Sequence, residues 1–176
     1  MRLFLYLSAI LGLIGVVAPA HAADDAGVNA LYGRLGELED SHDSSKLDAI
    51  YTPDAVYLGA KIRPVVGREA IKSAFAASWK TRSADGGIGS LKVRLIQRIW
   101  HGQSAVTDIG YGRLTRTYSD NTKKTEYFYS KFVTLALRQA DGSWRWRVDI
   151  DNSLAPETAD AEFDALKPVG ALRYDK

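Results

Sequence analysis

Residues 127–151 read YFYSKFVTLALRQADGSWRWRVDID, and this stretch decides the fold class. Two strand-like runs flank Asp141 and Gly142, and an Asp-Gly pair in that position is typical of a tight β-hairpin. Residues 127–138 are apolar or aromatic on both faces, so both faces of this strand should be covered. We expect helices to cover one face and a second copy of the chain to cover the other.

The same alternating pattern extends upstream through two further turns. His101-Gly102 and the polar residues 119–121 separate runs of roughly ten or more residues, which predicts an antiparallel meander. The first run is predicted to place apolar side chains on one face and basic side chains on the other: Leu91, Val93, Leu95 and Ile99 against Lys92, Arg94 and Arg98. The glycine-rich residues 83–90 before it are expected to form a surface loop.

The front half of the chain has helical spacing instead. Apolar residues from Val28 to Leu38 recur at helical intervals, which predicts a first helix. Gly67 is expected to open a later helix with Glu69 in its first turn and Arg82 in its last, as the helix dipole favours. The predicted fold class is therefore α+β, with N-terminal helices and a curved antiparallel sheet of about five to six strands.

Between these helices the pattern predicts a change from helix to strand at a proline. Leu47, Ile50 and Tyr51 have the spacing of a short second helix, which Pro53 should stop. Residues 54–59 are predicted to form the first strand. This interpretation assigns Tyr51 to a helix.

The two ends of the chain differ from the centre. Residues 1–22 combine Arg2, an apolar core and a small-residue A-x-A site, which is typical of a cleavable signal peptide. The alternative, a membrane anchor, would need an apolar core of about 20 residues. We predict a periplasmic or secreted protein that is free of the membrane after cleavage, with a main domain over residues 23–155 and a short helix and tail over residues 156–176.

Composition excludes several classes of site. The chain has no cysteine, which rules out disulfides, thiolate metal sites and a cysteine nucleophile. After loss of Arg2 with the signal peptide, 22 basic residues face 21 acidic ones, so no nucleic-acid partner is expected. His42 and His101 are the histidines that remain, and both lie near predicted turns. We therefore expect no metal and no cofactor.

Charged residues alternate along the last predicted strand. Strict alternation places Arg145, Arg147, Asp149 and Asp151 on one face, opposite Trp144, Trp146, Val148 and Ile150. Such a face is either a solvated surface with weak cross-strand ion pairs or the charged wall of a pocket. In a pocket, crowding by a second carboxylate would raise the pKa of an aspartate into the range of a general acid or base.

Three phrases of the sequence resemble the nuclear transport factor 2-like superfamily, which includes SnoaL-like cyclases and ketosteroid isomerases. They are LDAIYTPDAV at 47–56, VGREAI at 66–71 and DGSWRW at 141–146. The resemblance covers about residues 27–153 and implies a cone-shaped sheet wrapped around the helices, with the charged face of the last strand turned inward. The positions that match the isomerase catalytic groups are Gly59, Leu35 and approximately Val133, so no reaction is carried over.

The resulting functional hypothesis is a small-molecule-binding protein without an assigned reaction, acting as a homodimer through its sheet face. The alternatives are a lyase, isomerase or hydrolase, and a protein-interaction module. For the enzyme, the candidate catalytic residues are Asp108 or Asp149 as general base and Arg147 as the group that stabilises negative charge. The candidate ligand-binding residues are Tyr32, Tyr57, Trp79, Tyr129 and Asp151. For the tyrosines a place at the edge of the core is an equal alternative, for Trp79 a core role is favoured, and for Asp151 the alternative is the solvated face described above.

Overall fold

A computed structural model describes residues 22–84, 86–118, 123–155 and 163–166. Of the predicted signal peptide, only Ala22 lies within these residues. The predicted start of the C-terminal helix, at Pro156, lies outside them. The elements in chain order are α1 (Ala22–Ser41), the 3-10 helix η1 (Ser44–Ala49), β1 (Tyr51–Leu58), β2 (Val65–Val66), α2 (Arg68–Ser83), β3 (Gly87–His101), β4 (Ala105–Tyr118), β5 (Glu126–Arg138) and β6 (Trp144–Leu154). No helix in the described ranges has the length and apolar character that crossing a membrane requires.

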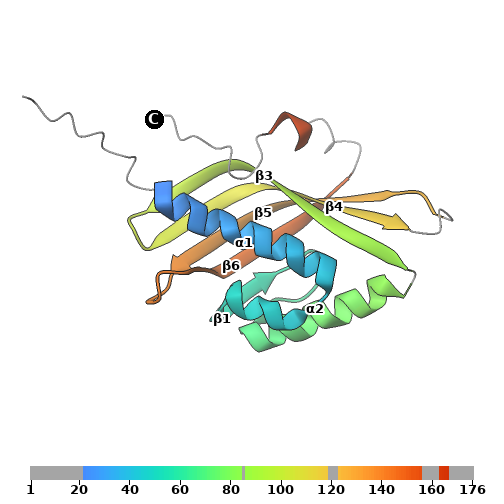
Figure 1. The fold of residues 1–176 in the computed structure, drawn as a ribbon, viewed down its shortest axis with the longest axis horizontal. Coiled ribbons are helices and arrows are strands. Elements are labelled where there is room, and N and C mark those ends of the chain that lie inside the picture. The colour runs from blue at the N-terminus through green and yellow to red at the C-terminus, as the bar shows by residue number, and fades with distance from the viewer. Residues whose placement is uncertain (1–21, 85, 119–122, 156–162, 167–176) are drawn as a thin grey trace, which may run out of the picture.

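The strands form one curved, unclosed sheet in the order β2-β1-β6-β5-β4-β3. The predicted meander is confirmed, since β3, β4, β5 and β6 pair antiparallel in sequence order. β1 pairs parallel with β6, so the sheet is mixed rather than wholly antiparallel. Figure 1 shows the long strands running behind the helices. The predicted α+β class is confirmed.

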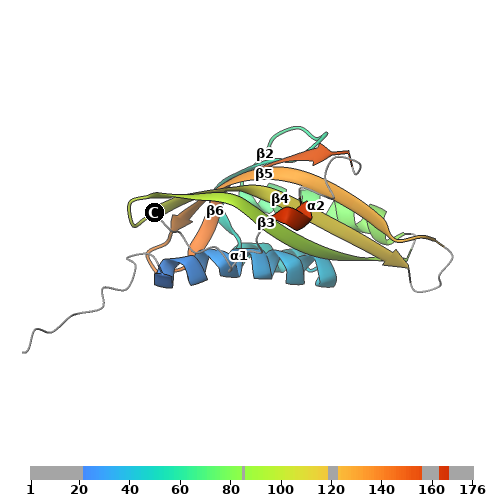
Figure 2. The same cartoon turned by 90° about the horizontal axis from the view of Figure 1, so that it is seen from above.

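Both helices pack on the concave face of the sheet, as Figures 1 and 2 show from perpendicular directions. The helical stripe predicted from Val28 to Leu38 is buried, and α2 adds Ile71 and Trp79. These side chains pack against inward residues of the strands: Leu95, Val106, Phe132, Ala136, Trp144 and Trp146. Burial of this apolar surface, at roughly 25 cal/mol per Å², is the main force that holds the helices on the sheet.

Two predicted boundaries are wrong. Tyr51 and Pro53 belong to β1 rather than to a helix, because Tyr51 pairs with Trp146 and the Trp146 N–H donates to the Ile50 carbonyl at 2.7 Å. Pro53 falls where the register of β1 against β6 shifts, a place where its missing N–H costs no ladder hydrogen bond. The predicted loop over residues 83–90 is also partly strand, since β3 begins at Gly87.

Register shifts in β3 and β6 change which side chains face inward. In β3, Leu95 pairs with Gly110 and Gln97 with Ile109, so Ile96 is an extra residue. In β6, Trp146 pairs with Ala136 and Val148 with Leu135, leaving one extra residue between them. A β-bulge of this kind reverses the alternation beyond it.

The consequence is a change in the polarity of the concave face. After the bulge in β3, Arg98 lies on the same side as Leu95, where it is 5% exposed. After the bulge in β6, Asp149 lies on the same side as Trp146 and is 8% exposed. Because of each bulge, an ionisable side chain points toward the space between the sheet and the helices.

The convex face is covered at one end. Phe163, from the described C-terminal residues, is fully buried against Tyr129 with ring centroids 6.0 Å apart. The Arg113 guanidinium lies 4.6 Å from the centroid of the Phe163 ring, a cation-π contact. Elsewhere on this face Ile96 and Val133 remain exposed.

Candidate functional site

One row of side chains crosses the concave face from strand to strand. The pairing registers align Arg98 on β3, Asp108 on β4, Thr134 on β5, Asp149 on β6 and Tyr57 on β1. Each strand contributes a single residue, so the row follows directly from the registers and from the two bulges. It contains two buried carboxyl groups, and their surroundings differ.

Asp108 is held by a complete set of donors. Arg98 donates from Nε to Oδ1 and from Nη2 to Oδ2, both at 2.7 Å, and the Tyr32 hydroxyl donates to Oδ2 at 2.8 Å. Arg98 Nη1 also donates to Asp25 on α1 at 2.9 Å. A two-point guanidinium contact is the strongest common arrangement for a carboxylate, and here it ties β3, β4 and α1 together.

Asp149 has a hydroxyl partner but no ion pair within the described part of the chain. The Tyr51 hydroxyl donates to Asp149 Oδ2 at 2.5 Å. Burial raises the pKa of Asp149 to about 7, the Tyr51 hydrogen bond opposes this, and the charge of Asp151 adds to it. A carboxyl group of this kind exchanges its proton near neutral pH, which is what general acid or base chemistry requires.

Asp151 and Tyr57 lie next to Asp149. Burial raises the pKa of Asp151, and hydrogen bonding from the Tyr57 hydroxyl and the Ala60 backbone lowers it. Burial and the two aspartates also raise the pKa of Tyr57, which keeps its hydroxyl protonated as a donor. The Tyr57 ring lies over Gly59, where an added Cβ would be 2.6 Å from the ring, so a larger residue here would displace Tyr57.

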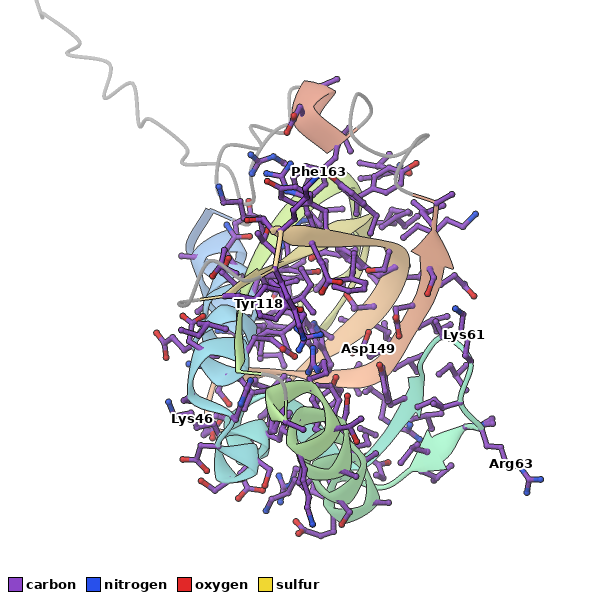
Figure 3. All side chains as sticks on the ribbon, turned by 90° about the vertical axis from the view of Figure 1, so that its right-hand side faces the viewer. Lys46, Lys61, Arg63, Tyr118, Asp149 and Phe163 are labelled. Atoms are coloured by element: carbon purple, nitrogen blue, oxygen red, sulfur yellow. The ribbon has the colours of Figure 1, made fainter. Side chains whose placement is uncertain are left out.

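A cavity of about 150 Å³, partly open to solvent, lies between α1, α2 and the sheet. Figure 3 looks into this hollow, with Asp149 inside the curve of the sheet and above α2. Aromatic rings and acidic groups dominate its lining, which consists of Tyr32, Leu35, Glu39, Tyr57, Phe75, Leu91, Val93, Gly112, Ser130, Phe132, Thr134, Trp146, Asp149 and Asp151. In the part of the chain that is described, no group of three or more His, Cys, Asp or Glu residues could hold a metal ion.

Four of the predicted site residues line this cavity: Tyr32, Tyr57, Asp149 and Asp151. Asp108 does not line the cavity, and its carboxylate accepts hydrogen bonds from Arg98 and Tyr32. Trp79 is a core residue that donates to Glu39 at 3.4 Å. Tyr129 lies on the convex face against Phe163, so it does not reach the cavity.

The predicted common face of Arg147 and Asp149 is wrong. Because of the bulge in β6, Arg147 points outward, where its guanidinium pairs with the exposed Asp54 at 3.1 Å. Arg145 likewise pairs with Asp141 at 3.4 Å, outside the cavity. The tryptophans and the aspartates of β6 therefore share the inner face, while the arginines lie outside.

The positions matched to the isomerase groups differ in their relation to the cavity. Leu35 lines the cavity and Gly59 lies beneath the Tyr57 ring. Val133 points away from the cavity and is 39% exposed, whereas its neighbour Thr134 lines the cavity. Val133, the position matched approximately to a catalytic group, therefore lies on the face opposite to the cavity.

Four polar residues at the site are not predicted from the sequence, among them Ser130 in the cavity lining. Tyr51, the donor to Asp149, has the spacing of a helical residue, and Glu39 and Thr134 also line the cavity. Pro53 is the available signal for Tyr51, since a proline also occurs at strand irregularities. No sequence signal marks Glu39, because it lies on α1 among other acidic residues.

Comparison with known proteins supports the fold. No family model matches the chain, and no curated protein matches it by sequence. An NTF2-like protein with a cystatin-like fold from Novosphingobium aromaticivorans is 19% identical, with a TM-score of 0.66 over 88% of this chain and 98% of that chain. A ketosteroid isomerase-like protein from Erwinia carotovora atroseptica is 15% identical, with a TM-score of 0.62 over 77% and 99%.

A third similar structure is Aln2 from a Streptomyces species, which is 17% identical, with a TM-score of 0.66 over 75% of this chain and 91% of that chain. These identities are low, so the likeness concerns the backbone architecture. Each of the three likenesses covers at least 75% of this chain and at least 91% of the other chain, and one of these structures is described as having a cystatin-like fold. The chain therefore has the fold of the NTF2-like proteins, the superfamily that its sequence resembles.

Proposed function

We propose that this protein is exported and binds a small organic molecule, about the size of one substituted ring, in the cavity beside Asp149. One observation carries the proposal: buried polar atoms of two cavity-lining residues lack a hydrogen-bond partner among the described residues. They are Asp151 Oδ1 and the indole Nε1 of Trp146. Buried polar atoms are nearly always paired, so a bound molecule that pairs with them is favoured.

The size of the cavity sets the size of the ligand. A cavity of about 150 Å³ accommodates a benzene-sized molecule. Phe75 and Phe132 supply apolar walls, while Asp149 and Tyr57 supply polar groups that can orient a ligand. Such a combination of apolar walls and a few convergent polar groups is typical of small-molecule sites.

A thermal-shift screen of single-ring compounds tests this proposal, because a molecule that binds only the folded state raises the melting temperature. Val93→Trp should fill the cavity and abolish the shift. Val66→Trp, at a 66% exposed position on β2 outside the cavity, is the matched control and should keep it. A broad library without a single hit on the unmodified protein would contradict the proposal.

A second candidate function is acid-base catalysis by Asp149. The favouring observation is a pKa of about 7 on a buried carboxyl that lines the cavity. In proton abstraction next to a carbonyl group, Asp149 would take the C–H proton and the electron pair would move to the carbonyl oxygen. The Tyr57 hydroxyl lines the same cavity, and by turning its hydrogen from Asp151 it would donate a hydrogen bond to that oxygen.

Deuterium incorporation into cyclohexanone tests this second function. In D2O at neutral pD, an enzyme of this type should exchange the protons next to the carbonyl faster than buffer does. Asp149→Asn should return the rate to that of buffer, whereas Asp54→Asn, on the outside, should not change it. An equal rate with and without the protein would contradict catalysis on this substrate class.

Export is proposed from residues 1–22, which have the composition of a cleavable signal peptide. Expression of the full chain in a bacterium, followed by fractionation and mass measurement, tests it. We expect the periplasmic or secreted fraction to contain a protein that begins at Ala23. Recovery of the full-length chain in the cytoplasm or the membrane would contradict export.

We also propose a homodimer through the convex face of the sheet. Ile96, Ile99 and Val133 are exposed there, at 50%, 37% and 39%. Exposed apolar side chains that gather on one face favour association. Light scattering at micromolar concentration should give the mass of a dimer, and Val133→Asp should give that of a monomer. A monomer mass for the unmodified protein would contradict the dimer.

A further inference from the structure

The charged groups that line the cavity are all acidic. They are Glu39 on α1 and Asp149 and Asp151 on β6, and the described lining contains no lysine, arginine or histidine. Arg98 faces the same hollow farther along β3, but it is engaged by Asp108 and Asp25. The cavity therefore offers negative charge to its contents.

The three carboxyl groups are not equivalent. Glu39 pairs with Arg82 on α2 at 3.0 Å, which offsets its charge. Asp149 and Asp151 interact instead with the neutral donors Tyr51 and Tyr57, and no ion pair to either is found within the described residues. In Figure 3 the side chain of Arg63, on the loop beyond β1, points away from the molecule rather than toward Asp149.

Aromatic rings surround the two carboxyl groups that lack an ion pair. Tyr57 and Phe75 lie with ring centroids 5.4 Å apart, and Tyr32 and Phe132 with centroids 5.8 Å apart. All four line the cavity, as does Trp146. The face of an aromatic ring attracts a cation, and the attraction is larger where water is excluded. Aromatic walls with carboxylates and without basic side chains are the composition that suits an organic ammonium group.

We propose that the ligand of this cavity is a small organic cation, a protonated amine on a single ring, whose nitrogen binds between Asp149 and Asp151. The proposal rests on small-molecule binding as proposed above, and it adds the class of ligand. The ammonium group supplies the donors that Asp151 Oδ1 lacks among the described residues, and the ring contacts the aromatic walls. An acidic ligand of the same size would face two like charges and no basic partner.

Three probes of equal shape and different charge test the inference: benzylamine, benzyl alcohol and benzoate. NMR titration of the mature protein at pH 8 gives the dissociation constant of each. We expect benzylamine to bind at least about tenfold more tightly than benzyl alcohol, which corresponds to about 1.4 kcal/mol. Benzoate should bind more weakly than benzyl alcohol or not at all.

Variants assign the effect to the two aspartates. The double substitution Asp149→Asn with Asp151→Asn should weaken the binding of benzylamine to the affinity of benzyl alcohol. The affinity of benzyl alcohol itself should remain nearly unchanged. Asp54→Asn removes a carboxylate outside the cavity and should change no dissociation constant. Circular dichroism and the melting temperature of each variant check that the fold is retained.

The outcomes separate the ligand class from ligand binding itself. If benzyl alcohol or benzoate binds as tightly as benzylamine, the cationic class is wrong while small-molecule binding stands. The same holds if none of the three binds but a neutral compound from the thermal-shift screen does. If no probe and no library compound binds, small-molecule binding and the cationic class both fail.

Discussion

Asp108 and Asp149 lie in one row on the concave face, separated by Thr134, and both are buried and bonded to a tyrosine hydroxyl. They differ in one group. Asp108 accepts two hydrogen bonds from the Arg98 guanidinium, whereas Asp149 has no ion pair among the described residues. Asp149 lines the cavity together with its neighbours in the row, Thr134 and Tyr57, whereas Asp108 does not.

The comparison shows how one scaffold separates stability from reactivity. A buried carboxylate with a two-point guanidinium partner is satisfied, and removing the partner is costly. A buried carboxyl without a cation retains its proton to a higher pH, because burial disfavours its charged form. We therefore interpret the Asp108 half of the row as structural and the Asp149 half as the functional site.

The largest effect is expected from Arg98→Met. This change leaves Asp108 buried without its cation and should lower the free energy of unfolding by about 3–5 kcal/mol. Adding Asp108→Asn in the same chain should restore much of the loss, because the uncompensated charge is removed. Urea denaturation at pH 7 measures both. If the free energy of unfolding of Arg98→Met lies within about 1 kcal/mol of that of the unmodified protein, the structural role of the Asp108 half is contradicted.

Asp149→Asn should instead raise the free energy of unfolding, by an amount that depends on pH. The pKa of Asp149 is raised from 3.8 to about 7 in the folded state, so folding keeps a proton that the unfolded chain releases. The protonated carboxyl makes its full contribution to the free energy of unfolding below about pH 4, and this contribution is lost as the pH rises to about 7. The asparagine avoids this loss.

The free energy of unfolding of Asp149→Asn minus that of the unmodified protein, at each pH, isolates the contribution of Asp149 from that of every other titrating group. It should grow from near zero at pH 4 to a gain on the order of 4 kcal/mol above pH 7, since one pKa unit corresponds to about 1.4 kcal/mol. Urea denaturation at several pH values measures it. A difference that does not change with pH would contradict the assignment.

The two tyrosines provide a matched pair with a smaller effect. Tyr51→Phe removes the hydrogen bond that lowers the pKa of Asp149, so this pKa should rise further. Tyr32→Phe removes a bond to Asp108 instead and should leave the pKa of Asp149 nearly unchanged. Each loss of a hydrogen bond to a carboxyl should cost about 1–3 kcal/mol. Equal pKa values of Asp149 in both variants would contradict the separation of the two halves.

The smallest effect is expected from Arg147→Ala. Its ion pair with Asp54 is on the surface, where such pairs contribute about 0–1 kcal/mol. Because the arginine lies outside the cavity, ligand affinity should not change. A tenfold loss of affinity for any ligand found in the thermal-shift screen would show that Arg147 reaches the site.

Local patterns in the sequence are sufficient to predict the helices and the antiparallel meander, but not the parallel pairing of β1 with β6. The helical spacing from Val28 to Leu38, the helix after Gly67 and the hairpin at Asp141-Gly142 each depend on residues close in sequence. Long-range packing decides the remaining boundaries. Tyr51 joins β1 because the Ile50 carbonyl and the Trp146 N–H meet across the sheet, which no local pattern records.

The site could be predicted only in part, because its composition depends on the two bulges. Neither bulge has a glycine or proline at the extra residue, since Ile96 and Arg147 occupy these positions. Strict alternation in β6 also gives a plausible pattern, with apolar residues on one face and charges on the other. The pattern therefore identifies Asp149 and Asp151 as a pair but assigns Arg147 to the wrong face.

The most direct test of the central claim is the pKa of Asp149, measured by NMR titration of its carboxyl carbon in the unmodified protein. The Asp149→Asn variant assigns the resonance. We predict a midpoint of about 7, because Asp149 is buried beside Asp151 and has no cationic partner among the described residues. A midpoint near the ordinary value of 3.8 would show that this carboxyl is solvated or paired, and it would contradict the division of the row into a structural half and a functional half.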